Sequence, residues 1–229
     1  MADSCFLYYI ADRTAFPGDE SLRRSRLLEK IGEAARAGVD YIQLREKDLR
    51  TRDLESLAQE AVSTIRKAQL ATGNRQPATA LLINSRTDVA LGVQADGVHL
   101  RSDDISPPEV RAIWENSINQ RGRGRLAREN PSQNPLIAVS CHTPAEVDRA
   151  AASATNFAVF APVFEKRDAH PAGLKLLREA CRTDIPVLAL GGVTIANAHS
   201  CLEAGAAGIA AIRLFQENDV AAVVKQLRG

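Results

Sequence analysis

Short apolar runs alternate along the chain with longer segments in which apolar residues recur every three or four positions. The short runs are typical of strands buried on both faces, and the recurrence is typical of amphipathic helices. The pattern predicts eight strands, at residues 5–10, 41–44, 80–83, 97–100, 136–139, 157–160, 186–190 and 208–212. It predicts eight helices, at residues 21–37, 51–71, 86–93, 107–114, 144–152, 173–181, 195–204 and 216–227.

Strict alternation of strand and helix predicts a parallel sheet built from right-handed βαβ units. Eight units are the number that closes a (β/α)₈ TIM barrel, so we expect an α/β fold with a single parallel, eight-stranded barrel domain over residues 1–229. A weak repeat, "AGVDYIQL", "QADGVHL", "SATNFAVF" and "AGAAGIAAI", supports this interpretation. The alternative is a doubly wound open sheet, which usually carries a glycine-rich phosphate loop after its first strand; "YYIADRTAFPGDE" does not provide one.

One segment interrupts the alternation. Residues 119–135, "NQRGRGRLARENPSQNP", are rich in Gly, Arg, Asn and Pro and have no apolar periodicity. Their arginines lack the interleaved aromatic residues of a nucleic-acid surface. We therefore expect a flexible insertion on the barrel face opposite the ligand site.

Composition and charge narrow the classes of function. The 229 residues are 45% hydrophobic and 25% charged, with a formal net charge of +1, which predicts neither nucleic-acid binding nor attachment to an anionic membrane. The four cysteines have no CxxC spacing, and we expect them to be small buried residues. The N-terminal "MADSCFLYYIADR" lacks the basic start of a signal peptide, and no apolar run approaches the roughly 20 residues of a membrane span, so we expect a cytoplasmic protein.

Polar residues that follow the predicted strands are the candidates for chemistry, because TIM barrels bind ligands at the C-terminal ends of their strands. In "QLREK", the side chains of Gln43, Arg45 and Lys47 would share one face of an extended chain. Burying three such groups without a partner is unfavourable. They therefore predict an anionic ligand.

A phosphate site is predicted at the last two strands. In "LALGGVT", Gly191 and Gly192 follow an apolar run, where backbone N–H groups could approach a phosphate closely. Arg213 follows the next run, where a guanidinium could bind phosphate through two hydrogen bonds. The glycine pair alone could also be a tight turn.

Three other side chains have two interpretations each. Asp104 could cap the following helix or bind a metal ion. His142 could be a core imidazole or a mouth residue, since it precedes a helix for which Thr143 is the predicted N-cap with Glu146 three residues on. His99 lies inside the fourth predicted strand, and we interpret it as structural rather than functional.

The motifs resemble those of the thiamine phosphate synthases and of the related thiazole tautomerases that share their barrel. The resemblance covers nearly the whole chain and rests on "YIQLREKDL", "LLINSRTDVALGVQADGVHL", "AVSCHT", "APVF" and "IPVLALGGVTIANA". It implies a transferase of thiamine biosynthesis that joins 4-amino-2-methyl-5-pyrimidinylmethyl diphosphate to a thiazole phosphate, with Mg²⁺ as cofactor and pyrophosphate as the second product.

The residue patterns and the resemblance together give the candidate roles. Lys47, Ser140 and His142 are the candidate catalytic residues, and Asp104 is the candidate Mg²⁺ ligand. The candidate substrate-binding residues are Gln43, Arg45, Lys47, Asn84, Ser140, Lys166, Arg167, Gly191, Gly192 and Arg213.

The chain departs from the family pattern in ways that make the site more basic. Ser85 replaces an acid that would be a second metal ligand, and Arg101-Ser102 replace a Gly-Gln pair. The sequence "EKRDAHPAG" replaces a Thr-x-Thr-Lys loop, and Arg213 replaces a serine. These changes predict a modified diphosphate and metal site, although they could equally describe an altered substrate.

Two alternatives to the synthase remain open. A thiazole tautomerase would need a phosphate site and a base but no metal, and His142 would be its proton carrier. A barrel that had lost activity could still bind a phosphorylated metabolite or a regulatory partner.

Overall fold

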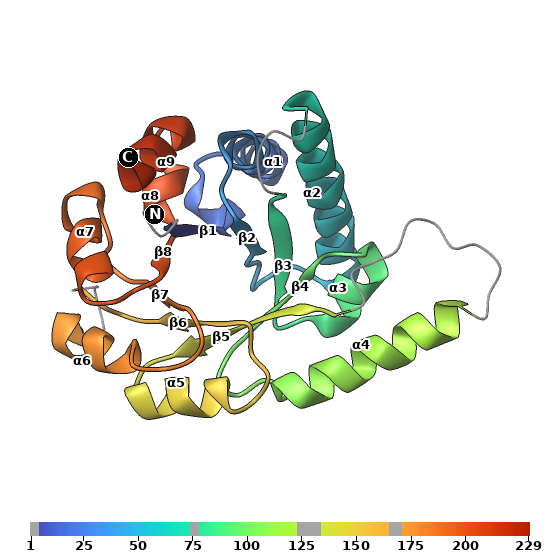
Figure 1. The fold of residues 1–229 in the computed structure, drawn as a ribbon. Helices are drawn as coiled ribbons and strands as arrows, with labels where there is room; N and C mark the ends of the chain where they lie inside the picture. The colour runs from blue at the N-terminus through green and yellow to red at the C-terminus, as the bar shows by residue number, and fades with distance from the viewer. Residues whose placement is uncertain (1–4, 74–77, 123–133, 165–170) are drawn as a thin grey trace.

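The eight strands of the chain form one closed parallel barrel in the order of the sequence (Figure 1). The structure is a computed structural model that describes residues 5–73, 78–122, 134–164 and 171–229. The (β/α)₈ fold predicted from the sequence is confirmed. The strands are β1 (Phe6–Ala11), β2 (Tyr41–Leu44), β3 (Ala80–Asn84), β4 (Gly97–Leu100), β5 (Leu136–Cys141), β6 (Phe157–Phe160), β7 (Val187–Ala189) and β8 (Gly208–Ala211).

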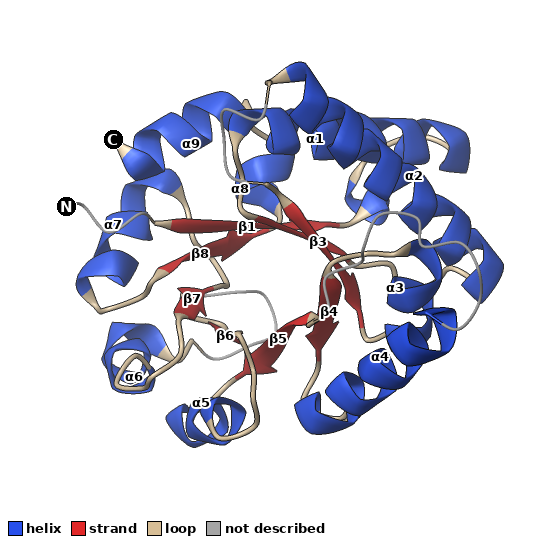
Figure 2. Cartoon of the chain, turned by 45° about the vertical axis from the view of Figure 1, so that its right-hand side comes forward, coloured by secondary structure: helices blue, strands red, loops and turns tan. Residues whose placement is uncertain are grey.

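Helices cover the outside of the barrel as a ring (Figure 2). Neighbouring helices pack side by side, most extensively α1 with α2. The ring consists of α1 (Glu20–Ala37), α2 (Thr51–Ala71), α3 (Thr87–Val93), α4 (Pro107–Gly122), α5 (Pro144–Ala151), α6 (Gly173–Ala180), α7 (Ile195–Glu203), α8 (Arg213–Gln216) and α9 (Val220–Arg228), with a short 3₁₀ turn η1 (Arg13–Ala15) after β1.

Two apolar layers hold the barrel together. The larger layer lies between strands and helices and contains Trp114, Tyr9 and most of the buried Leu, Ile and Val residues. The smaller layer fills the barrel interior, where the Tyr41 and Phe157 rings stack with centroids 4.7 Å apart and Tyr8 meets Phe157 edge-on. Because successive strand residues point to opposite sides, the same alternation that buries the Tyr41 ring directs Gln43, two positions further on, to the same interior nearer the barrel mouth.

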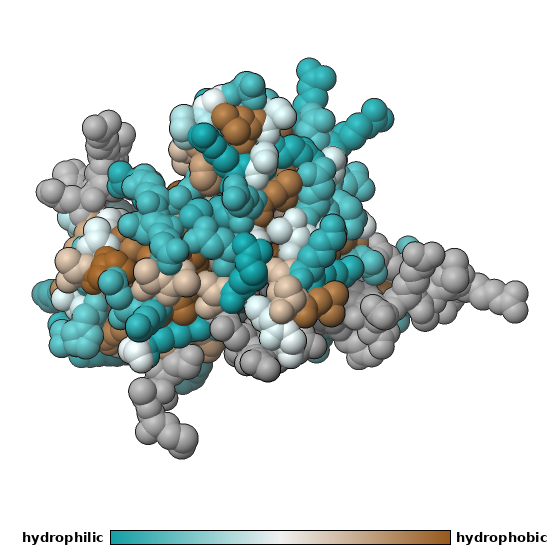
Figure 3. Space-filling model, turned by 90° about the horizontal axis from the view of Figure 1, so that it is seen from above, coloured by the Kyte–Doolittle hydropathy of each residue, from teal (hydrophilic) through white to brown (hydrophobic). Residues whose placement is uncertain are grey.

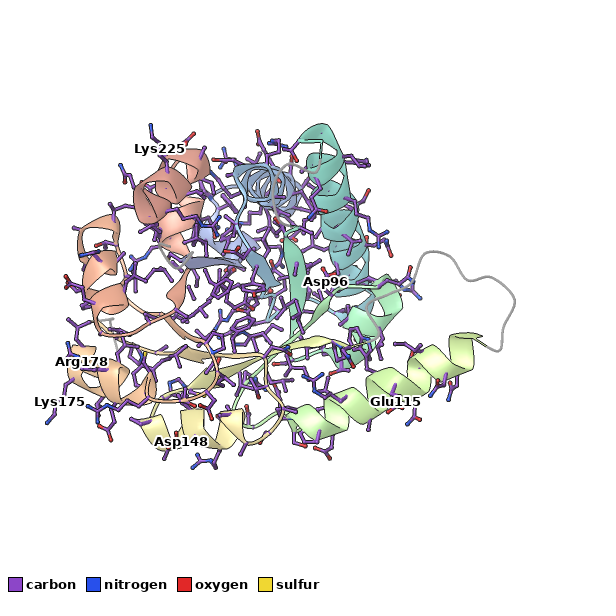
Figure 4. The ribbon with its side chains drawn as sticks, in the orientation of Figure 1. Asp96, Glu115, Asp148, Lys175, Arg178 and Lys225 are labelled. Atoms are coloured by element: carbon purple, nitrogen blue, oxygen red, sulfur yellow. The ribbon has the colours of Figure 1, made fainter. Side chains whose placement is uncertain are left out.

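Polar residues just before three strands anchor the N-terminal end of the barrel, which accounts for three of the four copies of the internal repeat. Asp40 accepts a hydrogen bond of 2.7 Å from the Leu7 amide. Asp96 and Asn156 do the same for the amides of Leu81 and Ile137, at 2.7 and 2.9 Å. Figure 4 shows Asp96 beside the barrel, whereas Glu115, Asp148, Lys175, Arg178 and Lys225 lie on the surrounding helices.

The boundaries of two predicted helices are wrong. The predicted helix at residues 216–227 begins too early: its residues 220–227 belong to α9, which Asp219 caps, whereas Gln216 is the last residue of the separate short helix α8. Helix α4 continues to Gly122, so residues 119–122 of the predicted insertion are helical. Residues 123–133, the main part of that insertion, lie outside the described residues.

The cysteines are largely buried, as expected from the sequence, and the surface is mixed in character. Cys5, Cys141 and Cys201 are buried, Cys181 is half-buried, and all four are free thiols. The face shown in Figure 3 mixes hydrophilic residues with smaller apolar areas. Among the described residues, no helix has the length and apolar character needed to cross a membrane.

Candidate functional site

A chain of hydrogen bonds crosses the barrel mouth from β2 to the loop after β4. The Gln43 amide nitrogen lies 2.8 Å from the Asn84 side-chain oxygen, and the Asn84 amide nitrogen lies 3.1 Å from the Ser85 hydroxyl. Ser85 Oγ in turn lies 2.6 Å from Asp104 Oδ2. Three of the predicted site residues therefore belong to one chain: Gln43 bonds directly to Asn84, and Ser85 links Asn84 to Asp104.

The carboxylate at the end of this chain sets the direction of every hydrogen bond in it. An ionised Asp104 can only accept, so Ser85 must donate to it. Ser85 then accepts from the Asn84 NH₂ group, and the Asn84 oxygen accepts from the Gln43 NH₂ group. Gln43 consequently keeps its carbonyl oxygen as the acceptor group that it brings to the mouth.

Asp104 is held at the mouth rather than at the start of a helix. Besides Ser85, it accepts from the Arg101 amide at 2.7 Å and from the Arg101 guanidinium at 3.2 Å. Burial opposes its ionisation, but the hydrogen bonds from Ser85 and Arg101 outweigh that effect and lower its pKa. Ser106 and Glu109 hydrogen-bond each other at the start of α4, so the capping interpretation of Asp104 is wrong.

The acids of "QLREKD" bind a buried arginine instead of a ligand. The Arg13 guanidinium lies 2.5 Å from Glu46 and 2.8 Å from Asp48, and it also contacts Glu20 at 2.6 Å. The Arg13 amide donates a further hydrogen bond of 2.9 Å to Glu46. Arg13 thereby ties the loop after β2 to the loop after β1.

Glu46 is the most buried acid of this group, and its pKa is raised to about 7. Its side chain is fully buried, which disfavours the charged form, while Arg13 acts in the opposite direction. One guanidinium serves three carboxylates here, so its charge does not fully compensate the burial of Glu46.

The two cations of "QLREK" lie after the end of the strand. Strand β2 ends at Leu44, so the strict alternation of an extended chain does not continue to Lys47. Arg45 is half-buried, 3.7 Å from Asp12, and its charge acts on His99 inside the barrel. Lys47 is exposed. Both cations are therefore carried by the loop that Arg13 holds in place.

Ser140 belongs to a second polar network inside the barrel. His99 Nε2 lies 2.7 Å from Ser140 Oγ, and His99 Nδ1 lies 3.0 Å from the Tyr8 hydroxyl. Burial lowers the pKa of His99 to about 3, with the Arg45 charge acting in the same direction, so the imidazole is neutral. Interpretation of His99 as purely structural missed its contact with Ser140, because no local signal in the sequence shows that strands β1, β4 and β5 bring these residues together.

His142 lies at the mouth, just after β5. Its Nδ1 is 2.6 Å from the Ala161 carbonyl oxygen, and its amide donates to Glu146. Thr143 caps α5 by accepting from the Glu146 amide at 3.2 Å, as predicted. Since a carbonyl oxygen only accepts, Nδ1 of a neutral His142 carries the proton and Nε2 is free to take one.

The glycine pair forms the turn between β7 and α7. Gly191 has a φ of 96°, and a Cβ at this position would lie 2.7 Å from the Pro162 backbone, so only glycine fits. Gly192 also has a positive φ, of 67°, and its carbonyl accepts from Asn197. Arg213 is an exposed residue that begins α8, after β8. A short helix after β8, together with the loop after β7, is a common position for phosphate in TIM barrels.

A cavity of about 300 Å³ opens beside this network. Asp104, Ser140 and Arg101 line one part of it, and Glu146 and Arg149 of α5 line another. Asp104 and Ser140 are both among its lining residues, together with Val139 and Cys141, which pack in the layer between strands and helices. Lys166 and Arg167 lie outside the described residues.

Comparisons with known proteins give a consistent result. The family description "Thiamine monophosphate synthase" matches residues 7–118 and 121–215. The thiamine-phosphate synthase of Roseiflexus sp. (strain RS-1) is 34% identical over 90% of this chain and 76% of its own length. That of Syntrophomonas wolfei is 33% identical over 97% of this chain and 94% of its own length. The solved structure of thiamine phosphate pyrophosphorylase from Pyrococcus furiosus aligns with a TM-score of 0.73 at 27% identity, covering 99% of this chain and 95% of that one.

Proposed function

Because this chain belongs to the thiamine monophosphate synthase family, we propose that it joins 4-amino-2-methyl-5-pyrimidinylmethyl diphosphate to a thiazole phosphate. The chain is a thiamine-phosphate synthase, a transferase of thiamine biosynthesis. The observation that carries this function at the site is the continuous network Gln43–Asn84–Ser85–Asp104 at the barrel mouth, beside the loop that bears Arg45 and Lys47.

The reaction needs charge stabilisation more than a general base. The C–O bond to the diphosphate breaks, and its electron pair leaves with the diphosphate. The remaining pyrimidinylmethyl cation then accepts the lone pair of the thiazole nitrogen, which forms the new C–N bond and leaves pyrophosphate as the second product. Preorganised charges around the leaving group are therefore the main catalytic contribution expected from the protein.

Arg45, Lys47 and Asn84 bind the leaving diphosphate in this proposal. The Arg45 guanidinium lies 3.7 Å from the Asp12 carboxylate, which is longer than a hydrogen bond. Arg45 can therefore turn to contact the more highly charged diphosphate. Lys47 is exposed at the mouth, on the same loop. Lys166 and Arg167, which would add positive charge, belong to the proposal on sequence grounds alone.

Mg²⁺ fits this site only if the substrate supplies most of its ligands. The described residues contain no cluster of three or more His, Cys, Asp or Glu side chains for a metal ion, and Asp104 is the carboxylate of the hydrogen-bonded network at the mouth. Mg²⁺ is commonly bound by one or two carboxylates together with substrate phosphates and water. When bound, Mg²⁺ would neutralise charge on the leaving diphosphate, with Asp104 as its protein ligand.

The two substrates bind to separate groups of residues in this proposal. Gln43 offers its carbonyl oxygen and Ser140 its hydroxyl to the aminopyrimidine. The backbone amides after Gly191 and Gly192, with Arg213 beside the start of α8, bind the thiazole phosphate. Arg101, which contacts Asp104, adds positive charge where Ser85 provides no carboxylate.

The test is a direct assay with purified protein, both substrates and Mg²⁺, in which thiamine phosphate is measured by chromatography. Arg45→Gln and Lys47→Gln should each lower kcat/KM for the pyrimidine diphosphate by at least tenfold, because each removes a charge from the leaving-group site. The matched controls are Arg52→Gln and Lys67→Gln, two exposed residues of α2, which should leave kcat/KM unchanged. Absence of thiamine phosphate formation by the wild-type protein would contradict the proposed function.

One observation favours the tautomerase alternative. His142 donates from Nδ1 to Ala161, which leaves Nε2 able to move a proton on a thiazole phosphate carboxylate. Tautomerase turnover that is unchanged in His142→Asn would exclude this role. The third alternative, a non-catalytic phosphometabolite-binding barrel, predicts calorimetric binding of thiazole phosphate without turnover.

A further inference from the structure

The polar network inside the barrel has a definite hydrogen-bond direction. The Tyr8 hydroxyl is completely buried, and the partner that the described residues give it is His99 Nδ1 at 3.0 Å. The two rings also stack, with centroids 5.8 Å apart and an angle of 30° between their planes. His99 Nε2 is in turn 2.7 Å from Ser140 Oγ.

Only one tautomer of a neutral His99 satisfies all these groups. If Nδ1 carried the proton, it would donate to Tyr8, and the buried Tyr8 O–H would have no acceptor, which costs about 1–3 kcal/mol. If Nε2 carries the proton, Tyr8 donates to Nδ1 and Nε2 donates to Ser140. Ser140 then receives a hydrogen bond at its oxygen and has its own O–H left to donate.

We propose that Tyr8 holds His99 as the Nε2–H tautomer and that His99 thereby makes Ser140 a hydrogen-bond donor to the substrate. This inference rests on the proposed function, and His99 and Tyr8 act in it as positioning residues, since neither is placed against the substrate. The burial that lowers the pKa of His99 keeps the tautomer neutral at physiological pH.

The directions of the two networks at the mouth are complementary. Asp104 orders the first network so that Gln43 presents an acceptor, and Tyr8 orders the second so that Ser140 presents a donor. An aminopyrimidine has an amino group that donates next to a ring nitrogen that accepts. The pair therefore favours an amino-substituted ring and disfavours a keto-substituted ring, in which the carbonyl oxygen accepts and the adjacent ring N–H donates.

The first experiment identifies the tautomer of His99 by NMR and does not depend on enzymatic activity. Histidine labelled with ¹⁵N gives distinct long-range ¹H–¹⁵N patterns for the two neutral tautomers, and His99→Gln assigns the signal among the four histidines. We expect a His99 signal of the Nε2–H form that does not change between pH 6 and pH 8. A signal of the Nδ1–H form, or titration in that range, would overturn the proposal.

The second experiment links the tautomer to substrate binding. Tyr8→Phe removes the group that selects the tautomer, and we expect the KM for the pyrimidine diphosphate to rise at least fivefold with the KM for thiazole phosphate unchanged. Tyr9→Phe is the matched control, because the Tyr9 hydroxyl contacts Gln216 on the outer side of the barrel. His99→Gln, whose amide can still donate to Ser140, should retain more kcat/KM than His99→Leu.

Failure of the inference and failure of the proposed function give different results. Equal pyrimidine KM values for Tyr8→Phe and Tyr9→Phe would overturn the role of Tyr8 in an active synthase. If the wild-type protein forms no thiamine phosphate, the proposed function fails, and the role of Ser140 as a donor to this substrate fails with it; the ¹⁵N measurement still decides the tautomer.

Discussion

Glu46 should make the stability of this protein fall as the pH rises through neutrality. Its carboxyl group has a pKa of about 7 in the folded chain, against an ordinary value of 4.5. A raised pKa means that the folded state binds the proton more tightly than the unfolded state does. The stabilisation is therefore complete below pH 4.5 and is lost as the pH rises through about 7.

The magnitude follows from the difference between the two values. Each pKa unit corresponds to about 1.4 kcal/mol, so a shift from 4.5 to about 7 corresponds to about 3 kcal/mol. The Glu46 side chain is fully buried, so solvent does not screen this contribution. Glu46→Gln provides a neutral side chain of the same shape and removes the pH dependence.

The assay is urea unfolding of the wild-type protein and of Glu46→Gln at pH 5, 6, 7 and 8, followed by circular dichroism. Relative to the variant, the wild-type free energy of unfolding should decrease by about 2–3 kcal/mol across this range, because part of the effect lies below pH 5. Asp48→Asn is the control: Arg13 lowers the pKa of the exposed Asp48, so its contribution is lost only at acid pH. A constant difference between wild type and Glu46→Gln, or one that grows with pH, would refute the reasoning and show that Arg13 keeps Glu46 ionised.

Three further predictions concern the site and its supports. Arg13→Met should destabilise the fold by about 3 kcal/mol in urea unfolding and raise the KM for the pyrimidine diphosphate, because it leaves a buried carboxylate without its cation and releases the loop that carries Arg45. Asp104→Asn should weaken calorimetric binding of Mg²⁺ with pyrophosphate at least tenfold, and unchanged binding would contradict its role as metal ligand. Gly191→Ala should cost about 2 kcal/mol or more in urea unfolding, since its Cβ would lie 2.7 Å from the Pro162 backbone; Gly173→Ala, with a positive φ but open space, should cost less.

The strands could be predicted from the sequence because their signals are local. A parallel strand covered on both faces must be apolar over most of its length, so the runs before "QLREK" and "GGVT" could be recognised without knowledge of their neighbours. Thr143 as the cap of α5 was equally predictable, because a helix cap is a contact between residues close in sequence. The short helix α8 was missed because its four residues are too few to show an apolar periodicity.

The sequence predicted which residues lie at the candidate site but not the hydrogen bonds between them. Gln43, Asn84 and Asp104 were expected at one mouth, but their order in a hydrogen-bonded chain depends on Ser85, which has a positive φ of 58° and reaches Asp104. The acids of "QLREKD" had no predicted role, yet Glu46 is buried against Arg13, which lies 33 residues earlier in the chain.

The sequence by itself determined the fold class, the positions of the strands and which residue types gather at their C-terminal ends, because alternation and apolar runs act within a few residues. Tertiary structure alone decided the partners of those residues, since closure of the barrel brings together side chains such as Tyr8 and His99 that are 91 residues apart. The direction of a hydrogen bond depends on every group that the two partners contact. The donor and acceptor pattern of the mouth therefore became visible only once β1, β4 and β5 were arranged around one interior.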